Sequence, residues 1–87
     1  MKSIIQKNKE CYLCFSPTVD EHHIFGGIAN RKLSEKYGLK VYLCRKCHSN
    51  AHTNKGCNLF LKTIGQRAFE KEHTRDEFRK IFGKSYI

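Results

Sequence analysis

Four of the five cysteines stand in two pairs of identical spacing. Cys11 and Cys14 enclose two residues, as do Cys44 and Cys47, and 29 residues separate the pairs. Four thiolates suit a tetrahedral zinc ion. A closed four-thiolate site leaves no position for water, so we expect this zinc to be structural and to contribute folding free energy directly. The alternative is a set of free or disulfide-bonded thiols. Cys57 has no partner spacing, and we expect a small buried apolar residue there.

Two histidines follow the second cysteine pair directly. His48 and His52 are four residues apart, and on a helix this spacing places both imidazoles on one face. Helical histidine pairs with the same spacing bind metal in other proteins. The spacing therefore favours a second metal site next to the cysteine site.

Two further histidines, His22 and His23, are adjacent in the chain. On a regular strand their side chains would point to opposite faces. Both can serve one cleft only if the strand ends or bends there, and Gly26 and Gly27 are close enough to allow this. The alternative for all four histidines is that they are surface or satisfied core residues beside a zinc site. His73 lies outside this set, and we expect it to be exposed at a helix end.

The net charge of +9 is concentrated in one part of the 87-residue chain. Residues 31–62 carry eight basic side chains and a single acidic one, whereas residues 1–30 are balanced. This excess lies around the candidate metal ligands and favours nucleic acid as the partner. A solvated basic surface that keeps the protein soluble is the alternative interpretation.

The elements that must position these ligands can be predicted from patterning. The length predicts one domain with a small core, which a cross-link such as a bound metal or a disulfide would stabilise. We expect strands over residues 19–25 and 39–43, and a helix over residues 28–37 with Gly38 as its C-terminal glycine. The buried stripe of this helix is predicted to contain Ile28, Leu33 and Tyr37.

The remainder of the chain is predicted to be helical. One helix runs through His48–His52 and another over residues 57–72, where apolar residues recur at threes and fours. Gly65 weakens the second helix by roughly 1 kcal/mol relative to Ala. A capping box at Thr74–Glu77 opens a last helix, which Gly83 closes.

Three runs of sequence together form a family pattern. They are Cys11-Tyr-Leu-Cys14, Glu21-His22-His23-Ile24 and Leu43-Cys44-Arg45-Lys46-Cys47-His48 with His52 behind it. With these runs the chain resembles the HNH family of nucleases, and most of all the small HNH proteins of phages and prophages. The resemblance implies an α+β fold, with a small zinc-stabilised ββα-metal (treble-clef-like) core and additional C-terminal helices. Residues 1–87 would be a single HNH-like domain, with the motif core over 11–52 and the helical extension over 57–87.

The same resemblance implies roles for individual residues. His23 takes the place of the general base, which removes a proton from the water that attacks the scissile phosphate. His22, His48 and His52 take the places of the ligands of a catalytic cation, which stabilises the phosphorane and the leaving group. Three imidazoles favour Zn²⁺, Ni²⁺ or Mn²⁺, and Mg²⁺ stays open because the substrate also supplies oxygens. The basic residues in the right neighbourhood to bind nucleic acid are Arg31, Lys32 and Lys46.

One position departs from the family pattern. Many HNH proteins carry an asparagine shortly before the second cysteine pair, which holds the metal loop or the base in position. Residues 37–43 of this chain contain no asparagine, and the nearest ones are Asn30 and Asn50.

The expected function is that of a metal-dependent endonuclease that hydrolyses phosphodiester bonds in DNA. One active site would nick one strand, and a homodimer would cut both. The alternatives are a catalytically inactive zinc-stabilised nucleic-acid-binding module and a phage-encoded protein that binds a host protein. The sequence shows no secretory signal and no apolar run of the roughly 20 residues that a membrane span needs, so we expect a cytoplasmic protein without a membrane partner.

Overall fold

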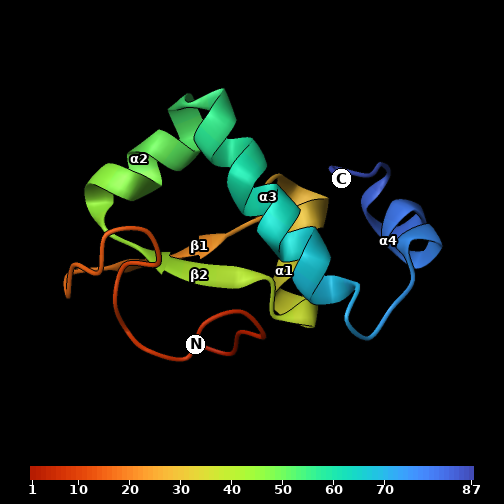
Figure 1. Cartoon of the computed structure of the whole chain (residues 1–87), viewed down its shortest axis with the longest axis horizontal. Coiled ribbons are helices and arrows are strands. Elements are labelled where there is room, and N and C mark those ends of the chain that lie inside the picture. The colour runs from red at the N-terminus through yellow and green to blue at the C-terminus, as the bar shows by residue number, and fades with distance from the viewer.

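A two-stranded antiparallel sheet lies at the centre of the fold, as the computed structural model of all 87 residues shows (Figure 1). Strand β1 (Asp20–His23) pairs with β2 (Lys40–Leu43), and the register sets His23 opposite Lys40. Each strand lies within its predicted segment and is shorter than it. Val41 and Leu43 are fully buried, as expected for the face of β2 that packs on the core. With its four helices, the protein has the predicted α+β class.

Helix α1 (Ile28–Tyr37) connects the two strands and has the predicted bounds. Gly38 ends it in the left-handed conformation (φ 70°), and a Cβ there would approach the N-terminal segment to 3.2 Å, so both the backbone and the packing require glycine. The buried stripe was predicted only in part. Leu33 and Tyr37 pack against the core, but Ile28 is 87 % exposed because it opens the helix beyond the core.

Helices α2 (Arg45–Thr53) and α3 (Lys55–Phe69) are separated only by Asn54. The Asn54 side chain caps α3 by accepting a hydrogen bond from the backbone N–H of Cys57 at 2.9 Å. Helix α3 therefore begins two residues before the predicted start. Helix α2 leads away from the end of β2, and α3 returns toward α1 (Figure 1). No helix of the fold has the length and apolar composition needed to cross a membrane.

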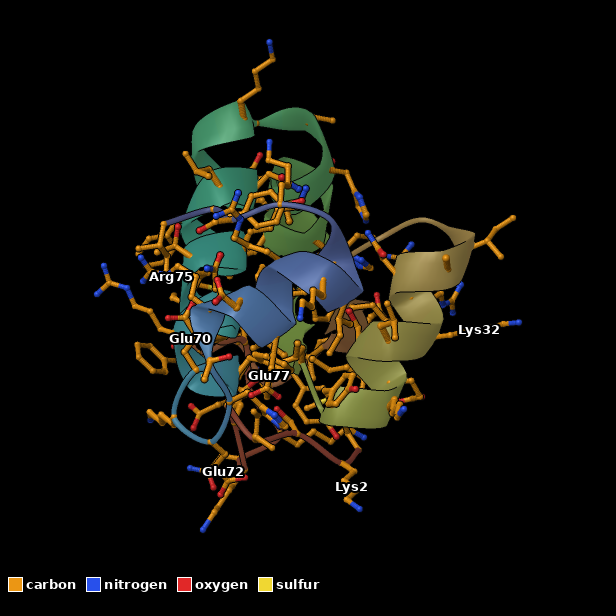
Figure 2. The ribbon with its side chains drawn as sticks, turned by 90° about the vertical axis from the view of Figure 1, so that its right-hand side faces the viewer. Lys2, Lys32, Glu70, Glu72, Arg75 and Glu77 are labelled. Atoms are coloured by element: carbon orange, nitrogen blue, oxygen red, sulfur yellow. The ribbon has the colours of Figure 1, made fainter.

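Helix α4 (Arg75–Phe82) completes the core from the C-terminal side. Both hydrogen bonds of the predicted capping box form, and Gly83 ends the helix in the left-handed conformation. Its apolar face joins a cluster of aromatic rings formed by Phe25, Phe69, Phe78, Phe82 and Tyr86. Arg75 at its start forms an ion pair with Glu70 at the end of α3, at 3.2 Å (Figure 2).

The N-terminal segment has no helix or strand and runs beside β2. The backbone N–H of Tyr12 donates to the carbonyl of Tyr42 at 2.8 Å, and the N–H of Tyr42 donates to the side chain of Gln6 at 2.7 Å. The Ser3 hydroxyl donates to the carbonyl of Lys40. The side of β2 that faces away from β1 is thus paired with the N-terminal segment.

Candidate metal centres

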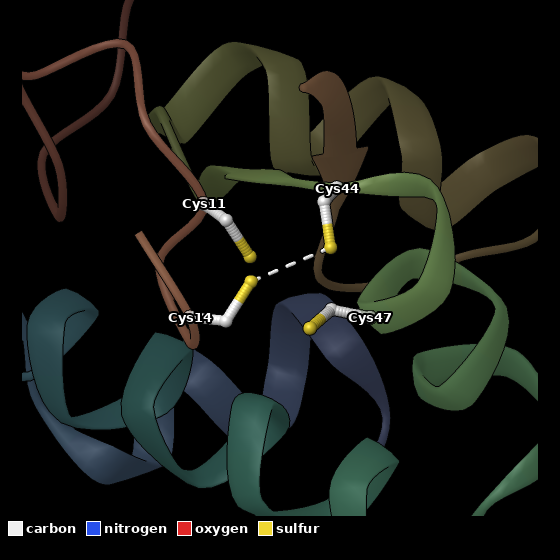
Figure 3. Close-up of side chains that lie close together, drawn as sticks. All are labelled: Cys11, Cys14, Cys44 and Cys47. Carbon is white, nitrogen blue, oxygen red and sulfur yellow. Dashed lines mark hydrogen bonds between the residues drawn. The ribbon is translucent and has the colours of Figure 1, made fainter. Parts of the chain in front are cut away.

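The four paired cysteines converge on one point (Figure 3). Their Sγ atoms all lie within 4.8 Å of one another, and those of Cys14 and Cys44 are 3.5 Å apart. A disulfide requires about 2.05 Å, whereas a zinc–sulfur distance of about 2.3 Å sets the sulfurs of a tetrahedron about 3.8 Å apart. The spacing and the soft donor set therefore fit a zinc ion. Cys57 lies outside this cluster, half-buried against the core.

Local backbone structure brings each cysteine pair into position. The first pair forms a turn in which the N–H of Phe15 donates to the carbonyl of Cys11 at 2.9 Å, and Phe15 itself has a left-handed φ of 67°. The N–H of Cys11 donates to the carbonyl of Ser16 at 2.8 Å, which closes the turn. In the second pair, Cys44 is the N-cap residue of α2 and Cys47 lies in its first turn. The cluster thus joins a loop to the start of a helix.

The thiols of the cluster have opposed pKa shifts. Burial raises the pKa of Cys11, but hydrogen bonds from the backbone N–H groups of Cys44, Cys14 and Leu13 outweigh it and lower the pKa to about 6. Burial and the neighbouring thiols raise the pKa of Cys47 well above the ordinary value. Like charges at this separation oppose full ionisation. A bound dication would offset that repulsion and allow all four thiols to act as thiolates.

The second cluster contains three of the four predicted histidines. The ring nitrogens of His22, His48 and His52 lie within 4.8 Å of one another. His22 comes from β1, whereas His48 and His52 stand one turn apart on α2, and their ring centroids are 4.9 Å apart. The centroid of His22 is 5.1 Å from that of His48. The helical spacing and the strand together build a three-imidazole set that could hold a divalent cation.

Burial favours the neutral form of two of these imidazoles, those of His22 and His48. His22 is only 3 % exposed, and desolvation, together with the nearby charges of His48, His52 and His23, lowers its pKa to about 4. Burial and His52 also lower the pKa of His48, which Asp20 partly opposes. A neutral imidazole presents a lone pair to a metal without first losing a proton.

The two adjacent histidines of β1 face the same cavity. The cavity, of about 310 Å³, is lined by the three clustered histidines and His23, together with Glu21, Gly26, Gly27 and Arg31. Strand β1 ends at His23, and the chain turns at Gly27, whose φ of 87° favours glycine. The buried hydroxyl of Ser34 bonds both the N–H and the carbonyl of Phe25 at 3.0 Å, which fixes this turn against α1. A regular strand would send the side chains of His22 and His23 to opposite faces. Because β1 ends at His23, both can line one cavity.

No protein-family model, curated protein or solved structure matches this chain. The interpretation of the site therefore rests on its own geometry and on the sequence resemblance. The geometry brings all the predicted cysteine and histidine ligands into two neighbouring clusters that share α2.

The three basic residues predicted to bind nucleic acid lie in two places. Arg31 lines the cavity with the histidines, and both Arg31 and Lys32 line an adjoining cavity of about 420 Å³. Lys32 projects from α1 away from the remainder of the molecule (Figure 2). Lys46 is exposed in the first turn of α2 and lines neither cavity. Only the two residues of α1 therefore border the histidine site.

Sequence patterning missed a charged group beside His23. Lys40 of β2 is 3 % exposed, and its Nζ contacts the carboxylates of Glu35 and Glu21. Burial alone would lower the pKa of Lys40, but the hydrogen bonds with both carboxylates outweigh it and raise the pKa. A hydrogen bond from Lys40 lowers the pKa of Glu35. The one sequence signal for this group was a lysine at the start of an otherwise apolar strand.

Proposed function

We propose that this chain is a metal-dependent endonuclease of the HNH type, with a treble-clef-like ββα-metal core. The observation that carries the proposal is the convergence of three imidazole nitrogens within 4.8 Å in a cavity that His23 and Arg31 also line. A structural metal needs no cavity, and four cysteines already supply a closed set. An open three-histidine set beside a fourth histidine and an arginine suits hydrolysis of a phosphodiester.

Each functional residue of the cavity has a separate role in the proposed hydrolysis. His22, His48 and His52 would hold the cation, which when bound supplies positive charge to a phosphate oxygen and to the leaving 3′ oxygen. His23 accepts the proton of the attacking water. The Arg31 guanidinium binds a non-bridging oxygen of the phosphate and orients it for attack. The water then forms the new P–O bond as the bond to the 3′ oxygen breaks.

Nucleic acid is the proposed partner because of the charge near the site. The net charge is +9, and the only acidic residue of residues 31–62 is Glu35. Arg31 and Lys32 of α1 stand at the cavity and beside it. Such a surface attracts a phosphate backbone without reading its sequence.

A plasmid assay with a panel of metals tests the proposal. Zinc-loaded protein is incubated with supercoiled DNA and Mg²⁺, Mn²⁺, Ni²⁺ or added Zn²⁺, with EDTA as the blank. We expect nicked circles with at least one cation and none with EDTA. His23→Ala should lower the nicking rate by about 10²- to 10⁴-fold, the usual cost of losing a general base, and retain DNA binding in a gel shift.

His73→Ala is the matched control, since His73 lies outside the cluster beside Phe69 and Glu77. It should nick DNA at the rate of the unmodified protein. Nicking by His23→Ala at the full rate would contradict the assignment of the base. A gel shift without nicking under every metal would instead support a binding module that lacks catalysis.

A further inference from the structure

Lys40 holds together a set of charges next to His23. It stands opposite His23 in the sheet register, and its side chain is only 4 % exposed. Its Nζ lies 3.3 Å from Oε1 of Glu21 and also contacts Oε2 of Glu35. A buried ammonium stays charged only when it is paired with a counter-charge. The contacts with Lys40 therefore restrict the positions of both carboxylates.

Glu35 reaches from this cation to the imidazole. Its Oε2 contacts Lys40, while its Oε1 lies 3.8 Å from Nε2 of His23. The side chain of Glu35 is 57 % exposed, and an exposed glutamate without a partner samples several rotamers. The contact with the buried lysine restricts that freedom and leaves the second oxygen 3.8 Å from the histidine ring nitrogen.

We propose that Glu35, fixed by Lys40, is the positioning residue for His23. The carboxylate takes the Nε2–H of the neutral ring as its partner, so that Nδ1 is the nitrogen that accepts the proton of the attacking water. Within this chain, the pair thus supplies the support that neither Asn30 nor Asn50 gives, since neither makes a side-chain hydrogen bond to a histidine and neither lines the cavity. The inference rests on the proposed function, because it assigns an orientation to the proposed base.

Replacement of Glu35 leaves Lys40 with a carboxylate partner. Lys40 keeps Glu21 as a partner at 3.3 Å when Glu35 is replaced. Helix α1 also keeps its packing, because Glu35 is on its exposed side. Glu35→Ala is therefore the informative variant, with Glu35→Gln as the conservative one. Glu72→Ala is the matched control, since this exposed glutamate lies in the turn after α3 (Figure 2) and lines neither of the cavities that His23 lines.

Steady-state nicking kinetics give the first measurement. We expect Glu35→Ala to lower kcat by about 10- to 100-fold, while KM stays within about twofold, because the base is misoriented and DNA binding is retained. The kcat of Glu35→Gln should lie between that of Glu35→Ala and that of the unmodified protein. The kcat of Glu72→Ala should equal that of the unmodified protein. A rise in KM at unchanged kcat would overturn the proposal, because it would place Glu35 in substrate binding.

A double variant tests whether Glu35 acts through His23. In the His23→Ala background, Glu35→Ala should cause no further loss of the residual nicking rate. A loss by the same factor in both backgrounds would overturn the proposal, since it would mean that Glu35 supports the fold or the phosphate independently of the histidine.

A spectroscopic measurement separates this inference from the proposed function. Nitrogen-15 chemical shifts of the His23 ring report which nitrogen carries the proton at a pH where the ring is neutral. We expect the Nε2–H tautomer in the zinc-loaded protein and a mixture of tautomers in Glu35→Ala. An identical tautomer ratio in both would overturn the inference even if DNA is cleaved. If no metal supports cleavage, the endonuclease proposal fails, and the tautomer ratio still decides whether Glu35 orients His23.

Discussion

At the scale of single residues, two neighbours in the sequence have different surroundings. His22 is 3 % exposed and faces two other imidazoles, whereas the His23 side chain is 17 % exposed and faces a carboxylate. Burial lowers the pKa of His22 to about 4, which leaves its lone pair available for a cation. His23 instead lies beside the Glu35 carboxylate, with its Nε2 3.8 Å from Oε1. Two adjacent residues of β1 thus have the surroundings of a candidate metal ligand and of a candidate base.

Removal of His22 should weaken cation binding. In zinc-loaded protein, we expect His22→Ala to reduce the affinity for Ni²⁺ by at least about tenfold, because one of three imidazole donors is lost. Isothermal titration with Ni²⁺ measures this, and His73→Ala should bind as the unmodified protein does. An unchanged affinity in His22→Ala would show that the three histidines do not act as one site.

At the scale of elements, Gly65 allows α3 to lie close against the chain that follows β1. A Cβ at this position would come within 2.9 Å of Cγ2 of Ile24 and 3.0 Å of the Phe25 ring, both buried. The helix propensity of glycine alone would make this residue a weak point of α3. Its packing makes it the point where α3 approaches the turn that positions His23.

Gly65→Ala should therefore destabilise the protein despite the better helix propensity of alanine. We expect a loss of about 1–3 kcal/mol in the free energy of unfolding, because two buried side chains must shift. Denaturant unfolding followed by circular dichroism measures it. Gly56→Ala is the matched control on the same helix, since a Cβ there meets only the Asn54 side chain, at 3.3 Å. A gain in stability in Gly65→Ala would refute this account of the packing.

Local signals explain which elements could be predicted. Helix α1 has the predicted bounds because Gly38 ends it, and α4 because Thr74 and Gly83 mark both of its ends. Spacing likewise identified the four cysteines and the His48–His52 pair, since a repeated C-x-x-C and an i, i+4 pair are local patterns. The place of His22 beside that pair came from the family resemblance. That the two clusters adjoin also followed from their shared helix.

Contacts between distant segments explain what could not be predicted. The ion pairs of Lys40 join α1 to both strands, so no sequence window contains them. The tight approach at Gly65 depends on residues about 40 positions earlier in the chain. The exposure of Ile28 follows from where α1 begins relative to the core, which periodicity within the helix does not contain.

At the scale of the whole molecule, the cysteine cluster ties the N-terminal segment to the remainder of the fold. Only 17 of 87 residues are buried, and the first 19 residues contribute no helix or strand. A core of this size provides little stability, so a metal ion that joins Cys11 and Cys14 to the start of α2 would stabilise the entire chain. Binding free energy at such a site is also folding free energy.

Loss of zinc should therefore lower the stability of the whole domain. We expect Cys47→Ser to lose the structural metal and to lower the melting temperature by at least about 10 °C, since about 1 kcal/mol already corresponds to 4–8 °C in a domain of this size. Metal analysis and thermal melts measure both effects. Cys57→Ser, outside the cluster, should retain the metal and melt within a few degrees of the unmodified protein. An unchanged melt in metal-free Cys47→Ser would contradict a structural role.

The pairing of the N-terminal segment with β2 has a consequence for self-association. The N–H and the carbonyl of Tyr42 both form hydrogen bonds with this segment. The outer edge of β2 therefore has no unpaired backbone group at Tyr42. A bare strand edge is a template onto which another chain can add. The cysteine turn anchors the segment that covers this edge. A zinc ion held by the four cysteines would thus act beyond the stability of one molecule, because it would also keep the outer edge of β2 covered and closed to strands from neighbouring copies.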